Sequence, residues 1–171
     1  MHNDGLSVGY RVKSFLLPIA DREPLAWIVT EQRTAFPHRR RREAEALDPG
    51  DQLFLYTTRG CFHNPTRDRG RVIGVATVTA RSERLREPLR FAEREFTVGV
   101  PFRIERLAAQ RQGVELAPLV KDLASFPNPR AWSVKLRRAL VPLTETDGQL
   151  LLRKIDEVAR PYPDAVASYA A

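Results

Sequence analysis

The segment from Leu47 to Val78 constrains the fold of this chain more than any other part of the sequence. Two of its stretches, Gln52–Thr57 and Val72–Val78, are rich in β-branched and aromatic residues and are typical of strands. A turn is predicted at 48–51, because Pro49 presets φ and Gly50 permits positive φ. The connection Thr58–Arg71 far exceeds the usual hairpin loop of about two to five residues. A long polar loop between two well-defined strands is typical of a binding loop.

Four further segments are predicted to be strands, and the first of them is Arg11–Leu17. Glu95–Leu107 alternates apolar and polar residues, which indicates one buried face. Ala26–Thr30 and Ala131–Val141 are apolar runs, each with a tryptophan near its start. The charged segment Arg81–Glu93 shows no such pattern, and we expect it to be irregular.

The predicted helices are few and short. His38–Leu47 is charged with a thin apolar face, and Leu116–Leu123 has the apolar spacing of a helix. Thr144 resembles an N-cap in front of a longer helix. Because strands come first and are mostly not joined by βαβ crossovers, we predict an α+β domain around a curled sheet or small barrel. One domain is expected over residues 1–160, followed by a loosely held tail at 161–171.

Composition narrows the class of protein further. The chain of 171 residues carries a net charge of +7 with a pI of about 10.2, which favours a polyanionic partner, nucleic acid first. A single cysteine, Cys61, excludes an internal disulfide and favours a reducing, cytoplasmic location. No apolar run approaches the roughly 20 residues of a membrane helix, so no membrane association is expected.

Sequence signatures of catalysis are few. No nucleophile elbow, P-loop, dinucleotide fingerprint or paired metal-ligand spacing occurs, so we expect no cofactor and no metal. Cys61 and His63 are two residues apart in a loop, a spacing that does not require their side chains to meet. We therefore interpret Cys61 as an ordinary loop cysteine.

Aromatic and basic residues are the main candidates for binding. Trp27 and Trp132 either pack in the core or form a stacking wall for a flat base. Hydroxyls of Tyr56, Thr57 and Thr58 suit a base edge. Arginines would hold a nucleic-acid backbone by charge, although the run at 39–42 is equally a solvated face paired with glutamates. These basic rim candidates are Arg39, Arg40, Arg41, Arg42, Arg67 and Arg69.

The order of these motifs resembles the EVE domain of the PUA-like superfamily. The segments AWIVT (26–30), LDPGDQLFLYTTRG (47–60) and GRVIGVATV (70–78) fall in the order that this family shows. Val100-Pro101-Phe102, Leu116–Leu123 and Ala131-Trp132-Ser133-Val134 follow in similar positions. The likeness covers most of residues 15–158. The chain departs from the family in its longer loop at 61–69 and in the tryptophan at position 132.

The resemblance implies a PUA-like pseudo-barrel of about five to six strands with short flanking helices. It also implies a non-catalytic module that accepts a flipped-out, modified base of DNA or RNA in an aromatic-walled pocket. Two alternatives remain open: an RNA-processing enzyme of the related ASCH kind, and a basic protein-interaction module. The residues expected at the site are Trp27 and Trp132 as walls, Tyr56, Thr57 and Thr58 at the base edge, Arg59 and Arg71 on phosphate or base, and Phe62, His63 and Asn64 on the loop rim.

Overall fold

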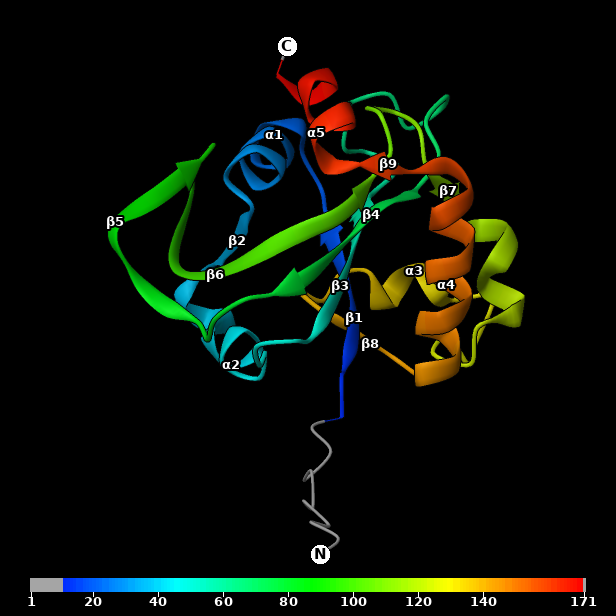
Figure 1. Ribbon diagram of the computed structural model, residues 1–171, viewed down its shortest axis with the longest axis horizontal. Coiled ribbons are helices and arrows are strands. Elements are labelled where there is room, and N and C mark those ends of the chain that lie inside the picture. Colours follow the sequence, from blue (N-terminus) through cyan, green and yellow to red (C-terminus); the bar gives the residue numbers. More distant parts are fainter. Residues whose placement is uncertain (1–10, 171) are drawn as a thin grey trace, which may run out of the picture.

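The strands of the molecule join into one strongly curled sheet, as the computed structural model of residues 11–170 shows (Figure 1). Their order is β2-β6-β4-β3-β1-β8, with β5 and β9 paired to β6 and β7 paired to β4. The strands are β1 (Ser14–Ile19), β2 (Arg33–Phe36), β3 (Gln52–Thr57), β4 (Arg71–Val78), β5 (Glu83–Phe91), β6 (Arg94–Leu107), β7 (Val114–Glu115), β8 (Val141–Leu143) and β9 (Arg160–Pro161).

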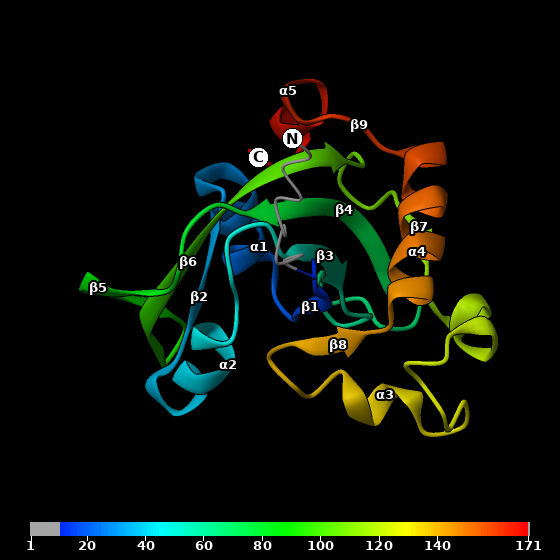
Figure 2. The ribbon, with the colours of Figure 1, turned by 60° about the horizontal axis from the view of Figure 1, so that its bottom comes forward.

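Short helices surround this half-barrel (Figure 2). The α-helices are α1 (Arg22–Glu31), α2 (Arg41–Glu45), α3 (Trp132–Lys135), α4 (Glu145–Val158) and α5 (Tyr162–Ala165), and the 3₁₀ helices are η1 (His38–Arg40), η2 (Ala117–Asp122) and η3 (Val166–Tyr169). The fold is therefore α+β and built around a curled, half-barrel sheet, as the sequence predicts. The crossover between the parallel strands β1 and β3 contains α1, β2, η1 and α2.

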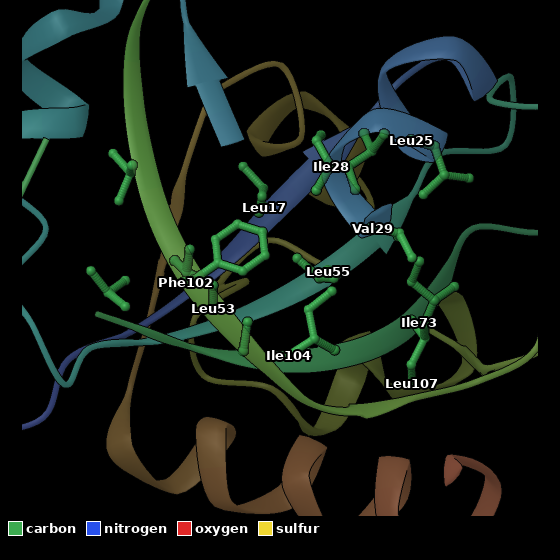
Figure 3. Close-up of a cluster of buried hydrophobic side chains, with 14 of the residues drawn as sticks. Leu17, Leu25, Ile28, Val29, Leu53, Leu55, Ile73, Phe102, Ile104 and Leu107 are labelled. Carbon is green, nitrogen blue, oxygen red and sulfur yellow. The ribbon is translucent and has the colours of Figure 1, made fainter. Parts of the chain in front are cut away.

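The central strand β3 is buried on both faces, which explains why its sequence is continuously apolar. Leu53 and Leu55 belong to the core cluster inside the curl, together with residues of α1, β4 and β6 (Figure 3). Phe54 and Tyr56 point to the opposite face, where η2, α3 and α4 cover the sheet. The sheet is thus packed on its outer side as well as inside the curl.

The segment Ala26–Thr30, predicted as a strand, is instead part of α1. The Asp21 side chain caps this helix by accepting a hydrogen bond from the Glu23 backbone N–H. Leu25, Ile28 and Val29 are buried against the sheet, at the i, i+3, i+4 spacing of one helix face. Local β-propensity is therefore overridden by the cap and by tertiary packing.

Two other predicted segments also differ. Ala131–Val141 is not a single strand: it contains α3 and a turn, and only its last residue enters β8. The supposedly irregular segment Arg81–Glu93 contains β5, which pairs with β6 as a hairpin. A register shift between Arg84 and Leu89 interrupts the alternation that would have revealed this strand.

The C-terminal segment is wrongly predicted to be a loose tail. Tyr169 is 1% exposed in the inner core cluster, and its hydroxyl donates a hydrogen bond to the Ala108 carbonyl at 2.6 Å. The Tyr162 hydroxyl donates to the carbonyl of Val29 in α1 at 2.8 Å. Residues 162–169 thus pack against α1 and close one end of the core.

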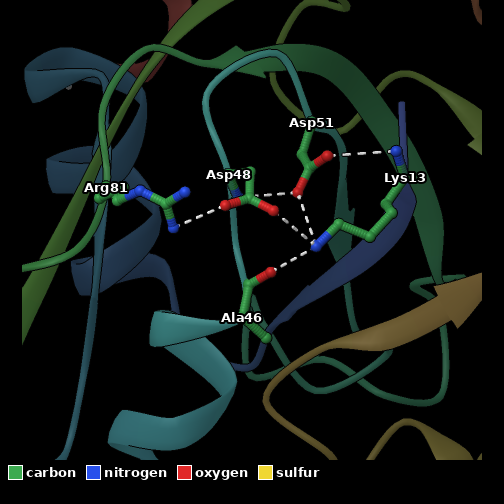
Figure 4. A network of polar contacts seen from close by, with 5 residues as sticks. All are labelled: Lys13, Ala46, Asp48, Asp51 and Arg81. Atoms are coloured by element: carbon green, nitrogen blue, oxygen red, sulfur yellow. Dashed lines mark hydrogen bonds and ion pairs between the residues drawn. The ribbon is translucent and has the colours of Figure 1, made fainter. Parts of the chain in front are cut away.

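The predicted turn before β3 is confirmed and is held by a polar network (Figure 4). Gly50 has φ of 93°. The fully buried Asp51 carboxylate accepts hydrogen bonds from the backbone N–H groups of Lys13 and Asp48. The Lys13 ammonium lies 3.1 Å from Asp48, whose other oxygen lies 2.7 Å from Arg81. This network fixes where β1 and β3 begin.

Candidate functional site

A cavity of about 640 Å³ opens between α1 and the β5–β6 hairpin. The end of β1, β2 and η1 also contribute to its lining. The segment 136–139, which connects α3 to β8, forms a further part of the wall. Its lining includes Leu17, Pro18, Ile19, Asp21, Glu23, Trp27, Thr34, Phe36, Arg39, Arg40, Thr58, Phe91, Arg94, Phe96, Leu136, Arg137, Arg138 and Ala139.

An aromatic row runs along one wall of this cavity. The ring of Trp27 meets Phe91 edge-on at 5.9 Å, and Phe91 meets Phe96 in the same way at 5.6 Å. The Arg33 guanidinium lies over the Trp27 ring, 5.4 Å from its centroid. The row joins α1 to the tip of the β5–β6 hairpin and offers apolar surface to a flat ligand.

Charges around the cavity are predominantly positive. Five arginines line it, against the two carboxylates of Asp21 and Glu23. The arginines come from three separate elements: Arg39 and Arg40 from η1, Arg94 from β6, and Arg137 with Arg138 from the segment before β8. Such an arrangement attracts anions to an apolar hollow.

Glu43 of α2 connects two walls of the cavity. One carboxylate oxygen accepts a hydrogen bond from Arg40 at 3.0 Å, and the other accepts one from the Leu140 backbone N–H at 3.1 Å. η1 and the segment 136–139 are therefore tied to the same side chain. The sequence predicts a pair between Arg39 and Glu43, but the structure pairs Glu43 with Arg40 instead.

His63 is tied to the mouth of the cavity through Asp21. Its Nε2 lies 3.0 Å from the Asp21 carboxylate. This hydrogen bond, together with that from the Glu23 backbone N–H, holds the pKa of Asp21 below its usual value. The long loop between β3 and β4 is thus attached to the N-terminus of α1.

Of the residues predicted to bind a base, Trp27 and Thr58 line the cavity. Tyr56 and Thr57 are buried and are not among its lining residues. Tyr56 packs in the outer cluster, where burial raises the pKa of its hydroxyl to about 12. The Thr57 hydroxyl points to the Arg71 carbonyl at 3.4 Å.

Other predicted loop residues contact the loop itself or the neighbouring segment 111–115, and they do not line the cavity. Phe62 lies under the Arg111 guanidinium at 4.9 Å, and the Asn64 side chain accepts a hydrogen bond from Thr66. Arg71 donates to the Arg111 carbonyl at 2.8 Å and lies 3.6 Å from Glu115. Arg59 is exposed beyond the end of β3 and is not among the lining residues.

The second predicted wall, Trp132, lies elsewhere. It packs edge-on against Phe126 at 6.2 Å, in the cluster on the outer face of the sheet. The two tryptophans therefore do not face each other across one pocket. Of the predicted basic rim, only Arg39 and Arg40 line the cavity; Arg41, Arg42, Arg67 and Arg69 do not.

Sequence reasoning missed most of the cavity wall. The sequence pattern places Phe96 on a buried strand face and predicts the segment of Phe91 to be irregular. No local pattern indicates Arg94, Arg137 and Arg138, because the strand order that brings them to β1 and α1 is not local. The sequence contains one signal for the arginines near the cavity: Arg137 lies in a segment that holds several basic residues and no acidic residue.

The remaining chemical candidates are limited. Burial raises the pKa of the Cys61 thiol to about 12, and His63 contacts Asp21 rather than Cys61, so these two residues do not form a nucleophile and base pair. Within residues 11–170, no group of three or more His, Cys, Asp or Glu side chains could hold a metal ion. None of the helices in that same range is long and apolar enough to span a membrane.

Comparison with known proteins gives structural likenesses only. No protein-family model and no curated protein matches the sequence. Among solved structures, the Mmi1 YTH domain complexed with RNA aligns with a TM-score of 0.58 at 10% identity, covering 86% of this chain and 79% of that one. The Pho92 YTH domain in complex with m6A gives 0.52 at 15% identity, with 84% and 83% covered. Human THYN1 in complex with 5-methylcytosine-containing DNA gives 0.53 at 12% identity, with 82% and 96% covered.

These likenesses define the class of fold. The chain shares the α+β, PUA-like architecture of the YTH domains and of THYN1 over more than four fifths of its length.

Proposed function

We propose that this protein is a nucleic-acid-binding module that takes one base into the cavity beside Trp27. The observation that carries the proposal is the combination of an aromatic row with five arginines around a single hollow. Aromatic faces stack on bases of any identity, and arginines contact phosphates. The cavity volume is within the range of about 300–1,000 Å³ typical of small-ligand sites.

We further propose that the base is modified and that the chain is an EVE-type member of the PUA-like superfamily. Two structures of similar fold are complexes with m6A and with 5-methylcytosine-containing DNA. An apolar pocket favours an added methyl group, because burying one CH₂-sized group contributes about 0.8 kcal/mol. Arg39, Arg40 and Arg94 would hold the adjoining phosphates.

The direct test is binding of short single-stranded oligonucleotides, with and without N6-methyladenine or 5-methylcytosine, by wild-type protein and by Trp27→Ala. Removing a stacking ring costs about 1–3 kcal/mol per base, so the affinity should fall by about 5- to 150-fold. Trp27→Phe should retain most of the binding. Because Trp132 is away from the cavity, the Trp132→Phe variant leaves Trp27 as a single fluorescent reporter, whose emission should be quenched by a stacked base.

Thermal melting of each variant separates loss of binding from loss of fold. The proposal is wrong if wild-type protein binds none of the oligonucleotides, or if Trp27→Ala binds like wild type. A steep decrease of log affinity with log salt would support phosphate contacts, whereas a flat dependence would favour an acidic protein partner. Oligonucleotide cleavage that His63→Ala abolishes would favour the enzyme alternative.

A further inference from the structure

The segment between η2 and the end of β8 forms a basic surface beside the cavity. Residues 123–143 contain four basic residues and no acidic one. The last part of this segment, residues 136–139, forms a wall of the cavity. A ligand that enters the cavity can therefore continue onto a cationic surface without meeting a carboxylate of the same segment. The basic residues are Arg130, Lys135, Arg137 and Arg138.

Three of these cations are available to a ligand. Arg130, Arg137 and Arg138 are exposed. Within the described part of the chain, no hydrogen bond or ion pair engages their guanidinium groups. Lys135 differs, because its ammonium donates a hydrogen bond to the Ser125 carbonyl at 2.7 Å.

Two carboxylates of neighbouring elements, Glu43 of α2 and Asp147 of α4, are already engaged. Glu43 accepts hydrogen bonds from Arg40 and from the Leu140 backbone. Asp147 is 2% exposed and accepts hydrogen bonds from the backbone N–H groups of Ala124 and Ser125. Neither acid is therefore available to pair with the three free arginines.

The basic surface is also held in place before any ligand arrives. Trp132 packs against Phe126, Lys135 binds the Ser125 carbonyl, and Glu43 binds the Leu140 N–H. A pre-ordered surface loses less conformational entropy on binding. These contacts hold the backbone on either side of Trp132 in place.

We propose that a single strand of nucleic acid, whose base occupies the cavity, continues over residues 130–138, with successive phosphates contacted by Arg138, Arg137 and Arg130. This inference rests on the proposed function of the cavity. A single strand fits this surface better than a duplex for two reasons. The basic segment is short and lies on one side of the cavity, so it can contact only one phosphate backbone. The base in the cavity has also already left its stack.

The test compares three oligonucleotides that carry the base preferred by the wild-type protein: a trinucleotide, and the same trinucleotide lengthened by three nucleotides on either the 5′ or the 3′ side. We expect the wild-type protein to gain affinity from one of the two extensions only. Arg130→Ala should remove part of that gain and leave trinucleotide binding unchanged. Its salt slope on the favoured long oligonucleotide should fall by about 0.7, the value for one phosphate contact to a single strand.

Two further variants complete the design. Arg153→Ala is the matched control, since Arg153 is an exposed arginine of α4 outside both the cavity and the basic segment. The double variant Arg137→Ala/Arg138→Ala should reduce the salt slope on the favoured long oligonucleotide by about 1.4.

The proposal is overturned if neither extension adds affinity, or if Arg130→Ala and Arg153→Ala behave alike. In that case Trp27-dependent binding of the trinucleotide would leave the proposed function intact. If no oligonucleotide binds, both proposals fail. Tight binding of poly-glutamate that depends on Arg130, with no gain from either nucleotide extension, would assign the surface to an acidic protein partner instead.

Discussion

At the scale of single residues, Gly70 explains why the Tyr56 side chain, which was predicted to contact a base, packs in the core instead. A Cβ atom at this position would lie 1.8 Å from the Tyr56 hydroxyl oxygen. The chain therefore needs glycine where the long loop enters β4, so that the Tyr56 ring can fill the outer cluster. Tyr56 and Gly70 act as one packing unit rather than as parts of a base-binding edge.

Replacing Gly70 with alanine should destabilise the protein by about 1–3 kcal/mol, the usual cost of overpacking a core. Chemical denaturation monitored by circular dichroism measures this change. Gly60→Ala is the control in the same loop, because no atom lies within 4 Å of the added Cβ, and it should be close to neutral. Equal stability of the two variants would contradict the packing role of Gly70.

At the scale of elements, the errors of sequence reasoning share one cause. The apolar residues of 26–30 satisfy a strand pattern and a helix pattern equally well, and Asp21 at the N-cap and Gln32 at the left-handed C-cap decide for the helix. The conformation of 131–135 is stabilised by contacts with Ser125 and Phe126, which no local pattern reveals. By contrast, β3, β4 and β6 were predictable, because each strand carries its own signal. Their apolar residues either alternate with polar ones or form a continuous run.

The short helix α2 should influence ligand binding although only η1, before it, lines the cavity. Glu43→Ala would release both Arg40 and the Leu140 N–H, so two walls of the cavity would lose their common support. We expect the affinity for a short oligonucleotide to fall by about 3- to 10-fold, equivalent to about 0.7–1.4 kcal/mol. Fluorescence titration measures this loss.

Glu45→Ala is the matched control for that experiment. Glu45 is an exposed glutamate of the same helix and does not line the cavity beside Trp27. Its removal changes the net charge equally, so a similar effect of both variants would mean that charge, and not the link between the walls, is responsible.

At the scale of the whole molecule, the topology and not the sequence pattern defines the site. Trp27 and Thr58 could be named in advance because each lies in a segment with a recognisable motif. The tip of the β5–β6 hairpin and residues 136–139 reach the same cavity although they follow Trp27 by more than 60 positions, through pairings that only the folded sheet establishes. Non-local strand pairing therefore limits how much of the site can be predicted from one sequence.

The C-terminal segment should be essential to the stability of the entire fold. Tyr169→Ala should cost about 3–5 kcal/mol, as for other large aromatic side chains removed from a core. Tyr169→Phe keeps the ring but leaves the buried Ala108 carbonyl without its hydroxyl donor, which should cost about 1–3 kcal/mol. Denaturant titration distinguishes the two, and a neutral Tyr169→Ala would show that this segment is dispensable.

The position of Tyr169 also has a consequence for the order of events during synthesis. The contact between residue 169 and residue 108, and that between Tyr162 and the carbonyl of Val29, form only after nearly all of the described chain has left the ribosome. Until then α1 and the end of β6 lack the residues that cover them, and apolar surface stays open to other chains. The emerging polypeptide would therefore depend on chaperones until residues 162–169 have packed against α1 and the end of β6.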